Sequence, residues 1–417
     1  MSWQRKKLGD IADLIVGFAF KSQHFLDASE CGVRLVRGDN VQQGFLRWGD
    51  KAKKWNSSDY EDFRRYQLEK DDVLLAMDRP IVGGGLKLAW VKELDLPCLL
   101  VQRVTRIRGA ENLARTNFLR YVLSTPAFLG HIESVTTGAN IPHISGKDIA
   151  SFELRLPPLA EQDRIVETLS AYDDLVEANL RRIELLEESA RLLYREWFIN
   201  FRFPGYETAH KTPSELGHIP HGWKIVSLKN VCSRVTDGAH KSPPTVEDGR
   251  PMASVKDMRD FDIDVAKCRK ISEKSYDELV KADCKVVKGD ILVAKDGSYL
   301  KHIFECGESE EIVLLSSIAM LRPNTEILGC FLMYALKSPD VNFRMRQCVS
   351  GVAIPRIVLK DFRNFKILLP PLQIQQEWVD IAGPMVQLCR ELVRQNDALK
   401  SSRDFLLPQL MSGAIQV

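Results

Sequence analysis

The sequence has few of the patterns that mark membrane, metal-binding or secreted proteins. It contains no uninterrupted apolar run of about 18 residues, so no transmembrane span is expected. Its first residues lack the apolar stretch of a signal peptide. None of its nine cysteines forms a C-x-x-C pair, which disfavours a zinc ribbon or a thioredoxin-like site. Reduced, mostly buried thiols in the cytoplasm are therefore expected.

Catalytic signatures are also missing. Three Pro-Pro pairs occur, but none has the Asn or Asp and the aromatic residue that flank this pair in methyltransferases acting on exocyclic amines. There is no G-x-x-x-x-G-K-[ST] phosphate loop, and the isolated run Gly83-Gly-Gly85 favours an ordinary loop. The segment Lys288–Lys295 faintly resembles a nuclease motif, although a strand ending in a turn explains it better. Three histidines lie in a Pro/Gly-rich linker without ligand partners at metal-site spacing, namely His210, His218 and His221.

The net charge of +2 excludes a uniformly basic nucleic-acid coat protein. Counted by segment, residues 1–158 have a net charge of +4 and residues 206–371 of +3. Residues 159–205 have −4 and residues 372–417 have −1. Two mildly basic parts therefore alternate with two acidic ones. Basic clusters occur in both, for example Arg103, Arg106 and Arg108 in the first and Lys267, Arg269 and Lys270 in the second. Each cluster is compatible with a solvated face or with a nucleic-acid surface.

What the sequence does contain is a tandem repeat. Phe118-Leu-Arg-Tyr-Val-Leu-Ser-Thr-Pro126 matches Phe331-Leu-Met-Tyr-Ala-Leu-Lys-Ser-Pro339 at an offset of 213. The same offset relates Leu156-Pro-Pro-Leu159 to Leu369-Pro-Pro-Leu372. Upstream, Lys70–Asp78 matches Lys288–Asp296. Each repeat therefore has a globular part, which mixes short buried strands with helices near 115–131 and 328–346, followed by a long helix.

The long helices carry a heptad seam. In the first, nine of ten positions with 4-3 spacing are apolar or aromatic; the ten are Ile165, Leu169, Tyr172, Val176, Asn179, Ile183, Leu186, Ala190, Leu193 and Trp197. The spacing favours a coiled coil over a single amphipathic helix on a core. The second seam lies 213 residues later, and Pro384 is expected to kink or delay that helix.

The two seams can pair with each other in antiparallel orientation around a pseudo-twofold axis. With Ile165 opposite Leu410, Asn179 faces Asn396, and this buried polar pair would fix the register at some cost in stability. A helix over residues 160–200 would be about 60 Å long at ~1.5 Å per residue. That length is on the order of one to two turns of B-DNA, so the helices would act as a ruler.

These features resemble the DNA-specificity (S) subunit of Type I restriction–modification systems. The resemblance covers essentially the whole chain and depends on the repeat and on four segments: Leu156-Pro-Pro-Leu-Ala-Glu-Gln-Asp-Arg-Ile165, Leu193-Tyr-Arg-Glu-Trp-Phe-Ile-Asn-Phe-Arg-Phe-Pro-Gly205, Gly217-His-Ile-Pro-His-Gly-Trp223 and Leu406-Leu-Pro-Gln-Leu-Met-Ser-Gly413. The second helix opens with Leu-Pro-Pro-Leu-Gln-Ile-Gln-Gln-Glu377, without the Glu-Gln pair of the first. This departure argues against the same role for the Glu-Gln pair in both repeats.

The resemblance implies an α/β (α+β) fold with two target-recognition domains, 1–158 and 206–371. The spacer helices would be 159–205 and 372–417. Each domain would read one half of a split DNA site, while the helices dock two methylation (M) subunits and the complex adds restriction/translocation (R) subunits. The chain itself would be non-catalytic and bind no cofactor or metal. Its partners would use S-adenosylmethionine, ATP and Mg²⁺ for adenine methylation and restriction.

Equivalent loops of the two repeats supply the candidate DNA-contacting residues. Base recognition favours Arg or Lys for guanine and Asn or Gln for adenine, and phosphates favour Lys, Arg and Ser. The candidates are Lys21, Arg79, Asn140, His143, Lys147, Lys241, Lys295, Ser298, Arg356 and Lys360. An ordinary surface role stays open for each.

Three alternatives stay open for the chain as a whole. It could serve a complex that only methylates, or be a self-sufficient DNA methyltransferase or nuclease. It could also be a coiled-coil adaptor without DNA binding, although this leaves two globular repeats with matched basic loops unexplained. The target bases and the gap between the half-sites do not follow from the sequence.

Overall fold

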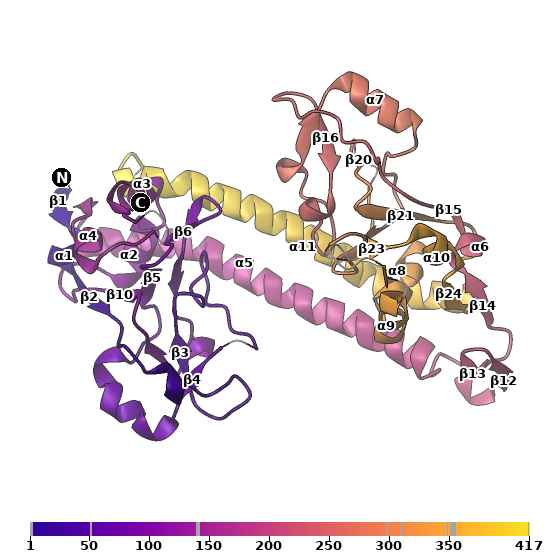
Figure 1. Ribbon diagram of the computed structural model, residues 1–417, viewed down its shortest axis with the longest axis horizontal. Helices are drawn as coiled ribbons and strands as arrows, with labels where there is room; N and C mark the ends of the chain where they lie inside the picture. Colours follow the sequence, from indigo (N-terminus) through magenta and orange to yellow (C-terminus); the bar gives the residue numbers. More distant parts are fainter. Residues whose placement is uncertain are drawn as a thin grey trace. The chain divides into compact units, whose positions relative to one another are not determined.

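The structure is a computed structural model that describes residues 3–50, 52–138, 142–297, 299–308, 311–347, 349–350, 356–415 and 417 (Figure 1). The chain divides into two compact units. The first consists of Met1–Val176 with Ala398–Val417, and the second of Glu177–Asp397. Among the described helices, none combines the length and the apolar character needed to cross a membrane.

The first unit is built on three small sheets and a hairpin. A β1–β11 ladder (Gln4–Lys7, Glu153–Leu156) lies beside an antiparallel sheet in the order β2-β10-β5-β8 (Ala12–Val16, Val104–Gly109, Val73–Ala76, Leu88–Trp90). A third sheet has the order β4-β3-β9 (Lys54–Trp55, Val33–Val36, Cys98–Leu100), with β3 and β9 parallel. The hairpin is β6–β7 (Ile81–Val82, Gly85–Leu86). The helices are α1 (Leu8–Ile11), η1 (Ser22–His24), η2 (Ser57–Tyr66), η3 (Glu93–Asp95), α2 (Thr116–Val122), α3 (Pro126–Val135) and α4 (Gly146–Ala150).

Three sheets of the second unit repeat the three sheets of the first strand for strand. Its ladder is β14–β24 (Lys224–Ser227, Lys366–Leu369), and its main sheet has the order β15-β21-β18-β19 (Cys232–Asp237, Ile318–Pro323, Ile291–Ala294, Ile303–Glu305). The third sheet has the order β17-β16-β20 (Arg269–Ile271, Arg250–Ala253, Val313–Leu314), again with one parallel pair. Additional hairpins are β12–β13 (Lys211–Ser214, Gly217–Pro220) and β22–β23 (Val349–Ser350, Arg356–Ile357). The helices are η4 (Arg195–Ile199), η5 (Tyr206–Thr208), α6 (Leu228–Val231), η6 (Val255–Asp257), η7 (Val265–Lys267), α7 (Glu273–Lys281), α8 (Gly329–Lys337), α9 (Pro339–Gln347) and α10 (Leu359–Asn364).

The apolar strands predicted from the sequence are the central strands of the main sheets. Every residue of β5 and of β18 is buried. The predicted helical stretches each form two helices, because Pro126 and Pro339 begin a new helix in the two units. Proline is favoured at this position, since its missing N–H has no partner there in any case.

An ion pair between a buried carboxylate and a partly exposed arginine recurs at the same place in both units. Asp72, 1% exposed, binds Arg108 through two hydrogen bonds of 2.7 and 2.8 Å. Asp290, 0% exposed, binds Arg322 in the same two-bonded way at 2.7 and 2.9 Å. Each pair joins the central strand to its neighbour. The two units therefore share a buried carboxylate and its arginine as well as the same strand order.

The two long helices, α5 (Leu159–Tyr194) and α11 (Leu372–Ser412), pair in antiparallel orientation within each unit. In the first unit, Ile165 of α5 shares one apolar core with Leu410 of α11. In the second, the rings of Tyr194 and Trp378 lie 5.7 Å apart, at the opposite ends of the same helices. The predicted antiparallel pairing is confirmed, and both helix ends also belong to the globular cores. The predicted delay at Pro384 is wrong, because α11 begins at Leu372 and continues through the proline.

The two asparagines of the seam are hydrogen-bonded. Asn179 and Asn396 are 0% and 3% exposed, and Asn179 Nδ2 donates to Asn396 Oδ1 over 3.0 Å. The same nitrogen donates to Gln395 Oε1, also over 3.0 Å. The predicted opposition of these residues is therefore present. Their role in fixing the register stays a prediction.

A glutamine at the start of each long helix has the same role in both units, although the Glu-Gln pair as a whole is not repeated. Gln162 is fully buried, accepts a hydrogen bond from the Arg115 amide and donates to the carbonyls of Leu113 and Pro157. Gln375 accepts from the Leu328 amide and donates to the carbonyls of Glu326 and Pro370. Only the preceding glutamate differs, since Glu161 is replaced by Ile374. Each glutamine ties its helix to the loop before the preceding domain's α2 or α8.

Candidate nucleic-acid interface

In the first unit, two loops meet where the buried strand β5 ends. Asp78 and His143 face each other in an isolated antiparallel bridge. The Arg79 amide donates to the Pro142 carbonyl over 2.7 Å, and the Ile144 amide donates to the Met77 carbonyl over 3.0 Å. The side chains at this point are therefore carried by loops that are fixed by main-chain bonds to the central sheet.

The side chains of these loops form a small charged cluster. His143 Nδ1 lies 2.8 Å from Asp78 Oδ1, and a guanidinium nitrogen of Arg103 lies 3.3 Å from the same oxygen. Arg79 is exposed, as is Lys147 in the first turn of α4. Two of the predicted residues, Arg79 and His143, are thus brought together directly.

Arg103 was missed as a candidate, although it belongs to a visible basic cluster in the sequence. Arg106 is buried and paired with Asp13, and Arg108 is bound to the buried Asp72. Only Arg103 of the three faces the loops beside Asp78. The sequence could not predict which of the three arginines faces these loops, because it does not show which carboxylate pairs with each of them.

The second unit brings the equivalent loops together. Asp296 and Arg356 form an isolated antiparallel bridge, and the Ile357 amide donates to the Lys295 carbonyl over 3.1 Å. Arg356 is exposed, and so is Lys360 in the first turn of α10. Arg356 therefore takes the place that His143 has in the first unit.

Lys295 is placed differently from the expected DNA-contacting lysine. Its side chain is only 8% exposed, and its Nζ lies 3.0 Å from Asp237 Oδ2 and 3.5 Å from Asp296 Oδ1. A direct contact with DNA would require this buried ion pair to open, which costs desolvation and Coulomb energy. Lys295 is better described as the cation that holds the two aspartates.

The remaining candidates lie on neighbouring loops or outside the described residues. Lys21 and Lys241 are exposed, each on the loop that follows the first strand of its main sheet, β2 or β15. Asn140 and Ser298 lie outside the described residues. Among the described residues, no group of three His, Cys, Asp or Glu side chains is arranged to hold a metal ion.

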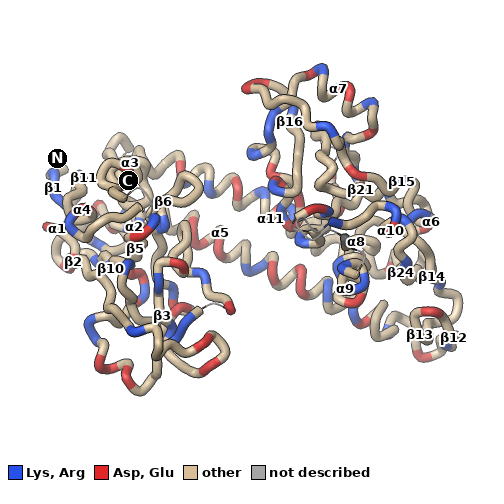
Figure 2. The backbone as a smooth tube through the Cα atoms, viewed as in Figure 1, with Lys and Arg blue, Asp and Glu red and all other residues tan. Residues whose placement is uncertain are grey.

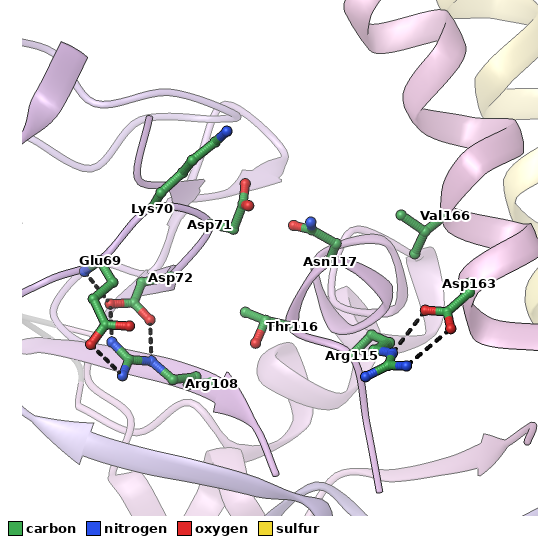
Figure 3. Close-up of a pocket in the computed structure, with 10 residues that line it drawn as sticks. All are labelled: Glu69, Lys70, Asp71, Asp72, Arg108, Arg115, Thr116, Asn117, Asp163 and Val166. Carbon is green, nitrogen blue, oxygen red and sulfur yellow. Dashed lines mark hydrogen bonds and ion pairs between the residues drawn. The ribbon is translucent and has the colours of Figure 1, made fainter. Parts of the chain in front are cut away.

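A polar pocket of about 310 Å³ in the first unit contains none of the predicted contact residues (Figure 3). Its charged walls are largely paired, since Arg108 binds Asp72 and Glu69, and Arg115 binds Asp163 over 2.8 Å. Figure 2 shows that basic and acidic residues alternate along α5 and α11 and are mixed over both units. Charge alone therefore does not locate the interface, and the equivalent loops remain the best candidates.

Comparisons with known proteins agree with the repeat. The family model described as the Type I restriction modification DNA specificity domain matches residues 1–188 and 220–398. The specificity subunit of the Type I restriction enzyme EcoBI from Escherichia coli is 28% identical over 393 residues, covering 91% of this chain and 78% of that protein. The EcoAI specificity subunit, also from Escherichia coli, is 35% identical over 175 residues, covering 42% of this chain and only 28% of that protein.

A solved structure also resembles the fold. The crystal structure of a Type I restriction-modification system S subunit from M. genitalium matches with a TM-score of 0.59 at 17% identity. The match covers 99% of this chain and 96% of that chain. At this level of identity the likeness concerns the fold alone.

Proposed function

The chain belongs to the Type I restriction modification DNA specificity family, and from this premise we propose that it recognises a split DNA site with one globular domain per half-site. The main support is that the same arrangement of three sheets occurs twice, with equivalent loops at the ends of β5 and β18. Two copies of one DNA-binding domain can bind two half-sites, and their different loop residues can recognise different base sequences.

The partners follow from the same proposal. The paired helices α5 and α11 would dock two methylation subunits, and restriction/translocation subunits would complete the nuclease. The chain would bind no cofactor or metal of its own. Its partners would supply S-adenosylmethionine, ATP and Mg²⁺, in the cytoplasm of a prokaryote. A complex that methylates without restriction would use the chain in the same way.

The experiment is a selection of DNA from a random library by the full chain assembled with its methylation subunits. The expected result is two short defined blocks separated by a fixed gap, with methylated adenines on opposite strands. The chain alone, incubated with S-adenosylmethionine and the selected DNA, is expected to transfer no methyl group. A single continuous block, or methyl transfer by the chain alone, would contradict the proposal.

Replacing Arg356 by alanine is expected to weaken DNA binding by the assembled complex. Arg356 is exposed on the loop equivalent to that of His143, where a guanidinium can contact phosphate. If it neutralises one phosphate, the slope of log affinity against log salt falls by about 1. Lys366→Ala is the matched control, because Lys366 is an exposed cation of the same unit bound to Glu215. Unchanged affinity of Arg356→Ala across the salt series would remove this residue from the interface.

A further inference from the structure

We propose that Arg79 is a specificity-determining residue that recognises a guanine in the half-site of the first domain, by donating hydrogen bonds to O6 and N7 in the major groove. This inference rests on the proposed function and names one base contact within it. It is carried by the backbone conformation of Arg79, its surroundings and its lack of a partner.

The first argument is the strained backbone. Arg79 has φ +46, a left-handed conformation that is costly for residues with a Cβ. The equivalent residue of the second unit is Gly297, with φ +66. The same turn is therefore built with glycine in one repeat and with arginine in the other. Strain of this kind is typically kept at functional sites, where the side chain itself is needed.

The second argument is that the Arg79 side chain is available. It is exposed and has no hydrogen-bond or ion-pair partner among the described residues. Its main chain is held by the 2.7 Å bond to the Pro142 carbonyl. The fixed main chain sets where this guanidinium can reach, and its planar arrangement of donors suits a contact with two acceptors.

The third argument concerns the choice between a base and a phosphate. A phosphate group presents only acceptors, so it offers the carboxylate of the neighbouring Asp78 no hydrogen-bond donor. In a guanine–cytosine pair, O6 and N7 of guanine accept hydrogen bonds from an arginine. The N4 amino group of cytosine donates one, which a carboxylate can accept. The adjacent Arg79 and Asp78 thus match a base-pair edge better than they match the DNA backbone.

The surrounding charges support the approach of DNA. His143 Nδ1 and a guanidinium nitrogen of Arg103 both contact Asp78 Oδ1, and the charge of Arg103 offsets that of the carboxylate. Two guanidinium groups, those of Arg79 and Arg103, therefore lie beside one carboxylate, which favours the approach of a polyanion.

The test uses Arg79→Gly in the full chain assembled with its methylation subunits. Because glycine is the residue of the other repeat, this variant relieves strain and is expected to keep or raise the melting temperature. Asp71→Gly is the matched control, since Asp71 has φ +69 and its repeat equivalent is Gly289 with φ +88. Both variants relax the same kind of turn, but only Arg79→Gly removes the proposed contact.

The readout is base preference, measured by selection from a random DNA library. Arg79→Gly is expected to lose roughly 5- to 150-fold discrimination at one guanine of one half-site, the range of a bidentate arginine–guanine pair. DNA with 7-deazaguanine at that position, which lacks the N7 acceptor, is expected to weaken wild-type binding but not that of Arg79→Gly. Asp71→Gly is expected to keep the wild-type preference.

Other outcomes separate this inference from the proposed function. If Arg79→Gly binds all sequences more weakly with an unchanged preference and a smaller salt slope, Arg79 contacts a phosphate and the inference is overturned. Unchanged binding and preference overturn it as well. A wild-type complex without any sequence preference would overturn the proposed function and this inference together.

Discussion

Replacing Asp290 by alanine is expected to lower the free energy of unfolding of the second unit by about 3 kcal/mol or more. The carboxylate is 0% exposed, holds Arg322 through two hydrogen bonds and accepts a third from the Val287 amide at 2.9 Å. The pKa of Arg322 is raised above its ordinary value by its hydrogen bond to Asp290, as expected for a stabilised cation. Removing the carboxylate leaves that guanidinium and a main-chain amide without their acceptor. Urea unfolding, followed by tryptophan fluorescence, measures the loss.

Glu215→Gln is the control for Asp290→Ala. Glu215 also pairs with a cation of the second unit, Lys366, but both side chains are about half exposed. Exposed pairs of this kind contribute less than about 1 kcal/mol. Equal effects of the two substitutions on the free energy of unfolding would show that the pair of Asp290 and Arg322 stabilises the unit no more than an exposed pair does.

Gln375→Ala is expected to destabilise the second unit by a similar amount, about 3 kcal/mol. The side chain is 0% exposed and satisfies one amide and two carbonyls that belong to three different loop positions. Each buried polar group left without a partner costs about 1–3 kcal/mol. The variant is also expected to loosen α11 from the domain, which hydrogen exchange of the Leu328 amide would detect.

The neighbouring Gln376→Ala separates this effect from a general effect on the helix. Gln376 is exposed, lies in the same helical turn and bonds only to Asp380 at 2.7 Å among the described residues. It is expected to change stability by a few tenths of a kcal/mol, as a surface helix pair does. If both variants unfold at the same urea concentration as the wild type, the hydrogen bonds of Gln375 do not stabilise the attachment of α11 to the domain.

The parts of the fold that follow from local patterns could be predicted from the sequence. The repeat offset located equivalent strands and helices, because insertions fall in loops while the core pattern is kept. The heptad spacing placed Asn179 opposite Asn396, because helical geometry alone determines which positions of an antiparallel pair meet.

The parts that depend on three-dimensional neighbours could not be predicted. Lys295 looked like an exposed cation, yet Asp237 reaches it from the end of a different strand and buries it. The common role of Gln162 and Gln375 was hidden by the change of the residue before each of them. Arg103 faces the loops because Arg106 is paired with Asp13 and Arg108 with the buried Asp72, and no sequence spacing predicts these pairings.

The first unit is discontinuous along the chain, and this has a consequence for its synthesis. Leu407 and Leu410 belong to the same apolar core as Leu8 and Ile165, although the whole second unit is translated between them. The domain that leaves the ribosome first is therefore completed last. At about 5–20 residues per second, Ile165 and Leu169 wait on the order of ten seconds or longer for their partner helix. During that interval Ile165 and Leu169 lack the contacts with Leu407 and Leu410 that complete this core, so the nascent first unit exposes apolar side chains that favour aggregation.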